Sequence, residues 1–288
     1  MSETLKPDAM PEEQNIVNTP EQADNAATTE LSHEQPVEET VVEAPAAAEG
    51  ESDNTDSRPA DRQEIVERLK AIADDLGITL IPQINVFGHA TQARGAAGKH
   101  ATLDVNPKYQ PLFEPLMGWN WCLSNPETRK LLQELIKERY EAFGCPPYFH
   151  IGCDEASTPS CPDCIKKTYS TLFLEHVNQM NEYVKGLGAQ TMMWHDMILD
   201  GKDSRWKGLH AKGTAETASG VNYISRDVII CDWYYRKALE EYPSHEYFKG
   251  LGFDVLACPW NNNEGTVSQC RHAHKTGIRG ILGTLWHH

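Results

Sequence analysis

The chain lacks a long hydrophobic run, and no stretch approaches the roughly 20 apolar residues of a membrane-spanning helix. Its first residues carry neither the basic region nor the apolar region of a signal peptide. Basic residues are scarce, since 26 Lys and Arg stand against 42 Asp and Glu for a net charge of −16. We therefore expect a cytoplasmic protein that binds neither a membrane nor nucleic acid, because no basic patch is present to neutralise phosphates.

The first sixty residues contain no aromatic residue and no cysteine. They hold 15 acidic residues against Lys6 and Arg58, a net charge of −13, and are rich in Glu, Pro, Ala and Thr. Residues 61–288 hold 27 acidic and 24 basic residues and all 24 aromatic residues. The acidic segment cannot bury enough apolar surface to offset the entropy of ordering. The composition therefore predicts a disordered tail over 1–60 and a folded domain over 61–288.

The folded part alternates amphipathic helix patterns with short apolar runs. The helix patterns, several of them closed by a glycine, fall at 61–76, 127–143, 169–187, 246–251 and 267–275. The apolar runs, which are typical of buried strands, fall at 78–86, 148–152, 189–194, 227–231, 254–258 and 280–284. Six strands that alternate with helices predict a parallel sheet.

Polar or aromatic clusters follow every predicted strand, and Asn85, Trp194 and Trp260 are examples. A (β/α)₈ barrel gathers its active site at the carboxyl ends of all its strands. A doubly wound sheet would instead collect its ligand groups at one switch point, and the sequence has no glycine-rich phosphate loop. The pattern therefore predicts an α/β fold of the (β/α)₈ TIM-barrel type, with six β/α units recognised.

Asp154 and Glu155 are the sharpest chemical feature of the sequence. Neighbouring residues of a strand point to opposite faces, but where the strand turns into a loop both carboxylates can reach one site. A carboxylate pair ringed by tryptophan suits cleavage of a glycosidic bond, with one group as proton donor and the other ionised. The residue types alone leave an alternative open, in which Asp154 only caps the following helix.

Residues 150–156, His-Ile-Gly-Cys-Asp-Glu-Ala, resemble the His-x-Gly-Gly-Asp-Glu signature of family 20 glycoside hydrolases, the β-N-acetylhexosaminidases. The resemblance implies that Glu155 is the general acid/base. It implies that Asp154 binds the 2-acetamido group of the substrate, whose carbonyl oxygen attacks the anomeric carbon in a retaining, substrate-assisted mechanism. The implied substrate is a glycoside with a terminal N-acetylhexosamine, and no cofactor is implied. Cys153 replaces the second glycine, which is tolerable if the backbone there needs no positive φ.

Further positions agree with this resemblance. The segment Asn85 to Ala90 is similar to the family's Asp-x-Pro-Gly-His segment, in which the His, here His89, supports the catalytic acid. The resemblance implies tryptophans that enclose the acetamide and the sugar face, and polar groups for the acetamide carbonyl and a ring hydroxyl. The substrate-binding residues predicted on this basis are His89, His150, Trp194, Asp232, Trp233, Tyr234, Trp260 and Trp286.

The resemblance covers about residues 62–288, and in the family two more β/α units precede the strand at 78–86. Six strands cannot close an eight-stranded barrel, and an open parallel edge would expose unpaired backbone groups. We therefore expect an incomplete barrel, either a fragment or a chain whose open edge is covered by self-association. Three interpretations follow: a hexosaminidase, a carbohydrate-binding barrel without activity, and an inactive truncated fragment.

Eight scattered cysteines in a domain of this size do not resemble a disulfide framework. Cys161 and Cys164 form one CxxC pair, whereas a zinc ribbon needs two. The implied active site contains no metal, and these two cysteines are the candidates for a structural zinc site. The alternatives are a redox pair and two reduced loop cysteines.

Overall fold

The computed structural model describes residues 58–90, 106–114 and 118–286, with side chains from residue 63 onward. The predicted acidic tail lies outside the described residues. The described part belongs to one compact unit, residues 55–288. No helix within the described ranges is both long and apolar enough to cross a membrane.

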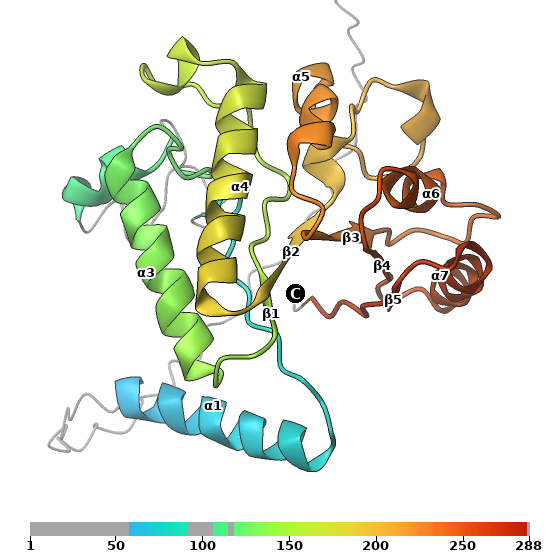
Figure 1. The fold of residues 1–288 in the computed structure, drawn as a ribbon, viewed down its shortest axis with the longest axis horizontal. Helices are drawn as coiled ribbons and strands as arrows, with labels where there is room; N and C mark the ends of the chain where they lie inside the picture. Colours follow the sequence, from blue (N-terminus) through green and yellow to red (C-terminus); the bar gives the residue numbers. More distant parts are fainter. Residues whose placement is uncertain (1–57, 91–105, 115–117, 287–288) are drawn as a thin grey trace, which may run out of the picture. The chain divides into compact units, whose positions relative to one another are not determined.

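Five parallel strands form a single sheet, in which strand order follows chain order from β1 to β5 (Figure 1). The strands are β1 (Tyr148–His150), β2 (Gln190–Trp194), β3 (Ile229–Trp233), β4 (Val255–Cys258) and β5 (Gly280–Ile281). All five coincide with predicted strands, although β3 begins and ends two residues later. The order never reverses, so the sheet has no switch point of the doubly wound kind.

The sixth predicted strand, 78–86, is an extended segment that lies beside β1. Its backbone amides at Ile84 and Val86 donate to the carbonyls of His150 and Ile151, both at 3.0 Å. One parallel bridge, Gln83 to His150, marks the pairing, so the contact is too short to count as a strand. Among the described residues β5 pairs only with β4. The incompleteness of the barrel and self-association at its open edge therefore stay predictions.

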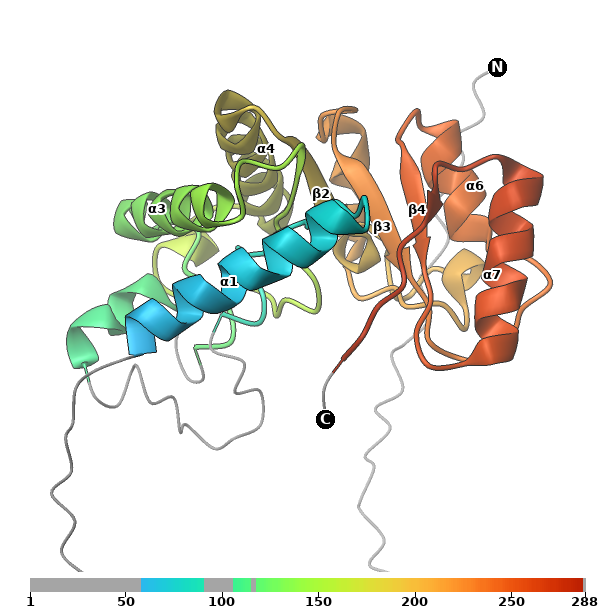
Figure 2. The same cartoon turned by 90° about the horizontal axis from the view of Figure 1, so that it is seen from below.

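Two helices precede β1, and the others lie in the connections between successive strands (Figure 2). They are α1 (Arg58–Asp75), α3 (Pro126–Ala142), α4 (Tyr169–Leu187), α5 (Ala215–Ser219), α6 (Pro243–Gly250) and α7 (Asn263–Thr276). Short 3₁₀ turns lie at Pro107–Leu112, Cys164–Lys166, Asp196–Ile198, Ser204–Trp206 and Gly220–Tyr223. All five predicted helices are confirmed. The sequence did not reveal α5 or the 3₁₀ turns, because elements of three to six residues carry too little periodicity.

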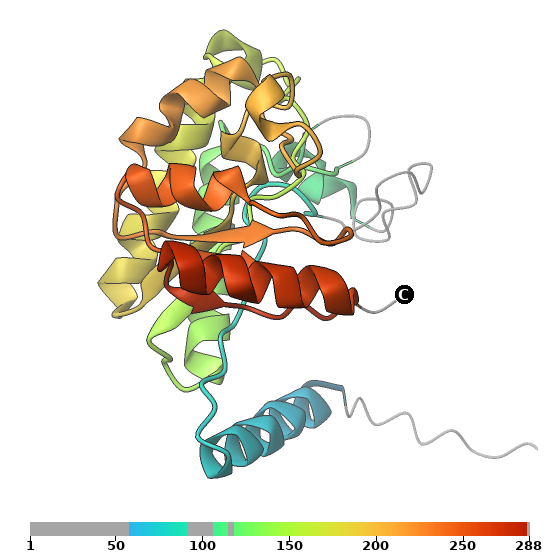
Figure 3. The ribbon, with the colours of Figure 1, turned by 90° about the vertical axis from the view of Figure 1, so that its right-hand side faces the viewer.

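The local sequence explains where the long helices begin and end. Asn125 accepts a hydrogen bond from the backbone amide of Glu127 at the start of α3, and Thr168 accepts one from Thr171 at the start of α4. Gly188 ends α4 in a left-handed conformation, with φ of 101°. Figure 3 shows α6 and α7 lying alongside the strands between them.

Successive strand residues face opposite sides of the sheet and supply two apolar clusters. Phe149, Met193 and Ile230 pack against the outer helices. Met192, Trp194 and Cys231 belong to a second cluster on the inner face, together with Trp233 and Cys258. The second cluster lies where a barrel has its interior, and it leads to the carboxyl ends of the strands. The large apolar residues of α1 differ, since Ile65, Leu69 and Ile72 are exposed, as is Leu76 just beyond its end.

Two glycines permit close contact between the segment beside β1 and the loop that follows β1. A Cβ at Gly88 would lie 2.2 Å from the backbone oxygen of Asp154, and a Cβ at Gly152 would lie 2.5 Å from the Asn85 side chain. Gly152 also has φ of 68°, a conformation that favours glycine. Any larger residue at Gly88 must push the two loops apart.

We predict that Gly88→Ala lowers the free energy of unfolding by about 2–3 kcal/mol, because the new methyl group meets backbone that cannot rotate away. Gly186→Ala is the matched control. Gly186 lies near the end of α4 with open space at its Cβ position. Alanine there should raise stability by up to about 1 kcal/mol. Urea unfolding of both variants and the wild type measures the difference, and equal stabilities would contradict the close-contact account.

Candidate active site

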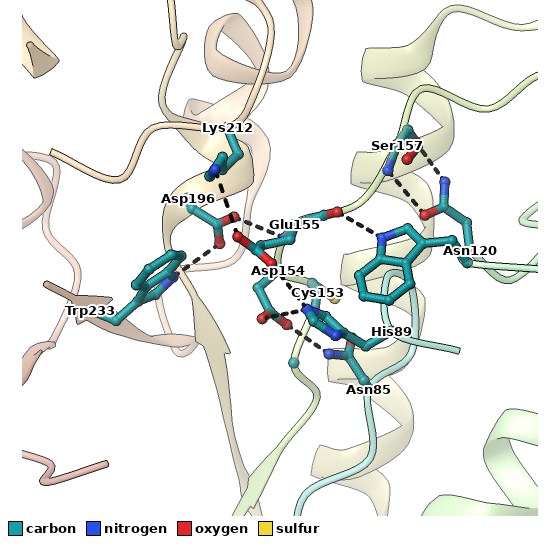
Figure 4. Close-up of polar contacts among 12 residues, drawn as sticks. Asn85, His89, Asn120, Cys153, Asp154, Glu155, Ser157, Asp196, Lys212 and Trp233 are labelled. Atoms are coloured by element: carbon teal, nitrogen blue, oxygen red, sulfur yellow. Dashed lines mark hydrogen bonds and ion pairs between the residues drawn. The ribbon is translucent and has the colours of Figure 1, made fainter. Parts of the chain in front are cut away.

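Asp154 and Glu155 lie in the loop directly after β1, with their side chains close together (Figure 4). The Asn85 amide holds this loop at two points. Its Nδ2 donates to Oδ1 of Asp154 at 2.6 Å, and its Oδ1 accepts from the backbone amide of Cys153 at 2.9 Å. The Asp154 side chain is 14% exposed and that of Glu155 is 26% exposed, so both are reachable from solvent. The alternative in which Asp154 only caps the following helix is wrong, because no helix begins at residue 155.

His89 lies between the two carboxylates. Its Nε2 is 3.2 Å from Oδ2 of Asp154 and 3.6 Å from Oε2 of Glu155. Burial alone would lower the pKa of His89, but the hydrogen bonds and negative charges of the two carboxylates outweigh it and raise the pKa to about 9. The His89 ring also packs on Trp119, with ring centroids 4.2 Å apart. At neutral pH a fixed imidazolium therefore lies against both acids.

Two hydrogen bonds fix the backbone of Glu155. Its amide donates to Oδ2 of Asp196 at 2.9 Å, and its carbonyl accepts from the indole of Trp119 at 2.9 Å. The ammonium group of Lys212 is 3.7 Å from Oε1 of the Glu155 side chain. The backbone is thus fixed on two sides, while the carboxylate keeps access to solvent.

Asp196 is fully buried beneath the pair, two residues beyond the end of β2. Burial and the negative charge of Asp154 raise the pKa of its carboxyl group. Its Oδ1 accepts a hydrogen bond from the indole of Trp233 at 3.4 Å. Asp196 therefore connects the loop after β1 to the end of β3.

Backbone strain concentrates at this site. Five non-glycine residues in the described part have positive φ, and three of them are His89 (55°), Cys153 (75°) and Glu155 (46°). Such residues cost on the order of 1–3 kcal/mol each and persist where the surroundings hold them in place. The family's glycine would be unstrained at position 153, so the condition under which cysteine would be tolerated without strain is not met. The Cys153 side chain is buried instead, with its thiol 3.7 Å from the carbonyl of Ile151.

Aromatic side chains from the next strands and loops lie beside the carboxylates. Trp194 packs on His150 at 4.3 Å and lies 6.2 Å from Trp286. Trp233 stacks on the ring of His210 at 3.9 Å and with an interplanar angle of 20°. His150 also accepts a hydrogen bond from the amide of Gly152, so it supports the turn that carries the pair.

Tyr235 also belongs to this group of rings, and we call Trp194, Trp233, Tyr235, Trp260 and Trp286 together the aromatic wall. The Tyr235 ring is 4.9 Å from Trp233 and 5.4 Å from Trp260, which is partly exposed. Burial and the negative charge of Asp154 raise the pKa of the Tyr235 hydroxyl, and hydrogen bonds with Thr284 and Trp286 lower it by less. Trp286 is 41% exposed, so this side of the wall is open to solvent.

The structure does not bring Asp232 or Tyr234 to the pair. Asp232 faces the helix layer, with Oδ1 3.3 Å from Nε2 of His195 and Oδ2 3.8 Å from Nε2 of His245. Tyr234 packs edge-on against Tyr242, with ring centroids 5.5 Å apart. The alternation of side chains along β3 explains both positions, because Trp233 and its second neighbour Tyr235 share the inner face.

Several residues of the site were not among those predicted from the sequence. Asn85 and Asp196 stand directly after strand-like segments, so the pattern of polar clusters contained the signal for both. Trp119 and Lys212 come from loops remote in sequence, where no periodicity or motif marks them. Cys161 and Cys164 lie in a separate cluster with Glu114 and Cys122.

The site combines a carboxylate pair after one strand of a parallel sheet with aromatic residues from the next strands. This arrangement is typical of enzymes that act on carbohydrates. The sequence model described as "Glycosyl hydrolase family 20, catalytic domain" matches residues 20–288. The chain belongs to glycosyl hydrolase family 20, whose members include β-N-acetylhexosaminidase-like glycosidases. The match begins earlier than the residue near 62 that the motifs alone indicate.

Individual relatives agree with the family. A lacto-N-biosidase of Bifidobacterium bifidum is 26% identical over 182 residues, which are 59% of this chain and 14% of that protein. Dispersin B has a TM-score of 0.51 at 19% identity, over 77% of this chain and 68% of its own. An inactive mutant of the exo-β-N-acetylglucosaminidase of Vibrio harveyi has a TM-score of 0.53 at 18% identity, over 78% of this chain and 37% of its own. These structures confirm a TIM-barrel-type α/β fold, and the chain spans 14% of the length of its curated relative.

We predict that the charge of His89 makes stability depend on pH. The pKa of His89 rises from 6.5 to about 9 on folding, so its contribution is complete below pH 6.5 and is lost as the pH rises through 9. The loss should be on the order of 2 kcal/mol. His89→Asn should remove it, and asparagine tolerates the left-handed backbone there.

Urea unfolding between about pH 6 and pH 10 measures this effect as the difference between variant and wild type. His274→Asn, at an exposed position of α7, is the control that should leave the profile unchanged. Parallel profiles for His89→Asn and the wild type would show that His89 is not held as a cation.

Proposed function

We propose that this chain hydrolyses glycosides with a terminal β-linked N-acetylhexosamine, either N-acetylglucosamine or N-acetylgalactosamine. The observation that carries the proposal is the half-buried Asp154–Glu155 pair, which Asn85 and His89 contact and which lies beside aromatic side chains. Membership of family 20 supports the reaction class. The names of the relatives, an exo-β-N-acetylglucosaminidase and a lacto-N-biosidase, support a substrate with a 2-acetamido sugar.

Glu155 is the general acid/base. Its side chain, at 26% exposed, is the more accessible of the two carboxylates, and two hydrogen bonds fix its backbone in place. In the first step it gives its proton to the glycosidic oxygen as the bond to the anomeric carbon breaks. In the second step it takes a proton from the attacking water. The ammonium group of Lys212 and the imidazole of His89 lie 3.7 and 3.6 Å from its two carboxylate oxygens.

Asp154 serves the substrate's own nucleophile. The acetamide carbonyl oxygen bonds to the anomeric carbon while the leaving group departs, and positive charge develops on the resulting ring. Asp154 accepts the acetamide N–H and stabilises this charge, a role that needs an ionised carboxylate in a fixed position. The hydrogen bond from Asn85 and the contact with His89 fix that position. Water then opens the ring with overall retention of configuration.

The aromatic wall supplies the sugar-binding surface. Trp286, which is 41% exposed, offers a face for the apolar side of the sugar ring, and the buried rings of Trp194 and Trp233 lie behind it for the acetamide methyl group. We propose that Tyr235, rather than Tyr234, supplies the phenol group at this wall, because Tyr235 shares the inner face with Trp233. Asp232 contacts His195 on the helix side of the sheet and does not bind the sugar.

The second candidate function is sugar binding without hydrolysis. The aromatic wall alone would suffice for it, whereas the strained and oriented carboxylate pair would have no purpose. Strain held at His89, Cys153 and Glu155 therefore favours catalysis. A folded chain that binds N-acetylglucosamine but never turns over a glycoside would favour the second function.

We predict that Glu155→Gln lowers kcat on a disaccharide of N-acetylglucosamine by about 10²–10⁴, the usual value of general acid help. The loss should be smaller with a nitrophenyl glycoside, since nitrophenolate departs without protonation. Glu138→Gln, on the exposed side of α3, is the matched control and should retain wild-type rates. Steady-state kinetics on both substrates makes the comparison. An equal loss on the two substrates, or no loss, would overturn the assignment of Glu155 as the acid.

A further inference from the structure

A second group of chemistry-bearing side chains lies outside the carboxylate site. Three cysteines and one glutamate come from two loops, and their ligand atoms all lie within 4.8 Å of one another. All four residues are at most 9% exposed. They are Glu114, Cys122, Cys161 and Cys164. None of them takes part in the proposed reaction.

The sulfur atoms already have the spacing of a metal site. The Cys122 sulfur is 3.6 Å from that of Cys161 and 3.8 Å from that of Cys164. Zinc binds thiolates at about 2.3 Å in a tetrahedron, which places neighbouring sulfurs about 3.8 Å apart. No pair among the eight cysteines, all of which are described, forms a disulfide.

The glutamate completes the set of four. Its Oε2 accepts hydrogen bonds from the backbone amides of Ser160 at 2.7 Å and Cys161 at 2.8 Å. Its Oε1 is also buried, and the Cys164 thiol lies close enough to interact with the carboxylate. A buried carboxylate that is anchored through one oxygen and lies within 4.8 Å of three thiols has the form of a metal ligand.

A β-bridge and a tight turn bring the four residues together. An antiparallel bridge between Phe113 and Trp121 brings Glu114 beside Cys122. The CxxC pair closes a turn in which the amide of Cys164 donates to the sulfur of Cys161 at 3.3 Å. Amide donors of this kind offset the negative charge that thiolates carry when they bind a metal.

We propose that these four side chains bind one structural zinc ion. Three thiolates and one carboxylate match the soft, tetrahedral preference of zinc, and the full ligand set leaves no open position for a substrate or water. Binding releases the protons of the three thiols to solvent, and no electron transfer is involved. Cys145, exposed elsewhere, and Cys153, directed toward Ile151, are not part of the site.

The ion joins the two loops that hold the catalytic acid. The loop of Glu114 and Cys122 also carries Trp119, which binds the carbonyl of Glu155. It carries Asn120 as well, whose side chain exchanges two hydrogen bonds with the backbone of Ser157, at 2.6 and 3.0 Å. The zinc site therefore links the same two loops that these hydrogen bonds join at Glu155 and Ser157.

The test measures metal directly, independent of activity. The full 288-residue chain is purified without chelator and its zinc content is determined by mass spectrometry, beside Cys161→Ser and the control Cys145→Ser. We expect about one zinc per chain in the wild type and the control, and less than about a tenth in Cys161→Ser. Cobalt in place of zinc should give the thiolate charge-transfer band and intense visible bands of a tetrahedral sulfur site.

A second measurement covers the case in which Cys161→Ser fails to fold. Chelator added to the folded wild type should remove the zinc, make the three site thiols reactive toward a disulfide reagent, and lower the melting temperature. Folded wild type without zinc and without a cobalt spectrum would overturn the proposal. So would full zinc content in Cys161→Ser, or thiols that react equally before and after chelation.

Discussion

The two hydrogen bonds of the Asn85 side chain determine where the carboxylate pair lies. One bond holds Asp154 and the other holds the backbone of Cys153, so a single amide positions both the loop and its first acid. Gly152 has no side chain because that amide lies against it, and Gly88 has none because the Asp154 backbone lies against it. The extended segment beside β1, which bonds to His150 and Ile151, thus anchors the site to the sheet.

Charge then organises what packing has placed. His89 is positive because two carboxylates surround it, and those carboxylates can lie close together because His89 is positive. The pKa of the Asp196 carboxyl group, below them, is raised as well, by burial and by the negative charge of Asp154. The strained backbone of Glu155 is held from two sides by Asp196 and Trp119. The site is therefore an electrostatic unit, in which each group depends on its neighbours.

The sequence predicted the parts of the fold that periodicity and local motifs encode. The strand and helix pattern, the pair after β1 and the support of His89 were all readable in short windows. The direction of β3 side chains was not, because a motif shows that Tyr234 and Tyr235 follow the strand without showing which faces inward. Contacts between distant loops were also hidden, and so Lys212, Trp119 and the partnership of Cys122 with the CxxC pair emerged only in three dimensions.

The proposed reaction depends on the acetamide group of the substrate, which acts as the nucleophile while Asp154 binds its N–H. The most direct test is to incubate the full chain with nitrophenyl N-acetyl-β-glucosaminide and, separately, with nitrophenyl β-glucoside, and to follow the anomeric proton of the first product by nuclear magnetic resonance. We expect hydrolysis of the first glycoside with release of the β-anomer, and a rate lower by at least about 10³ for the second. Comparable rates on both glycosides, initial release of the α-anomer, or no hydrolysis by a folded chain would contradict it.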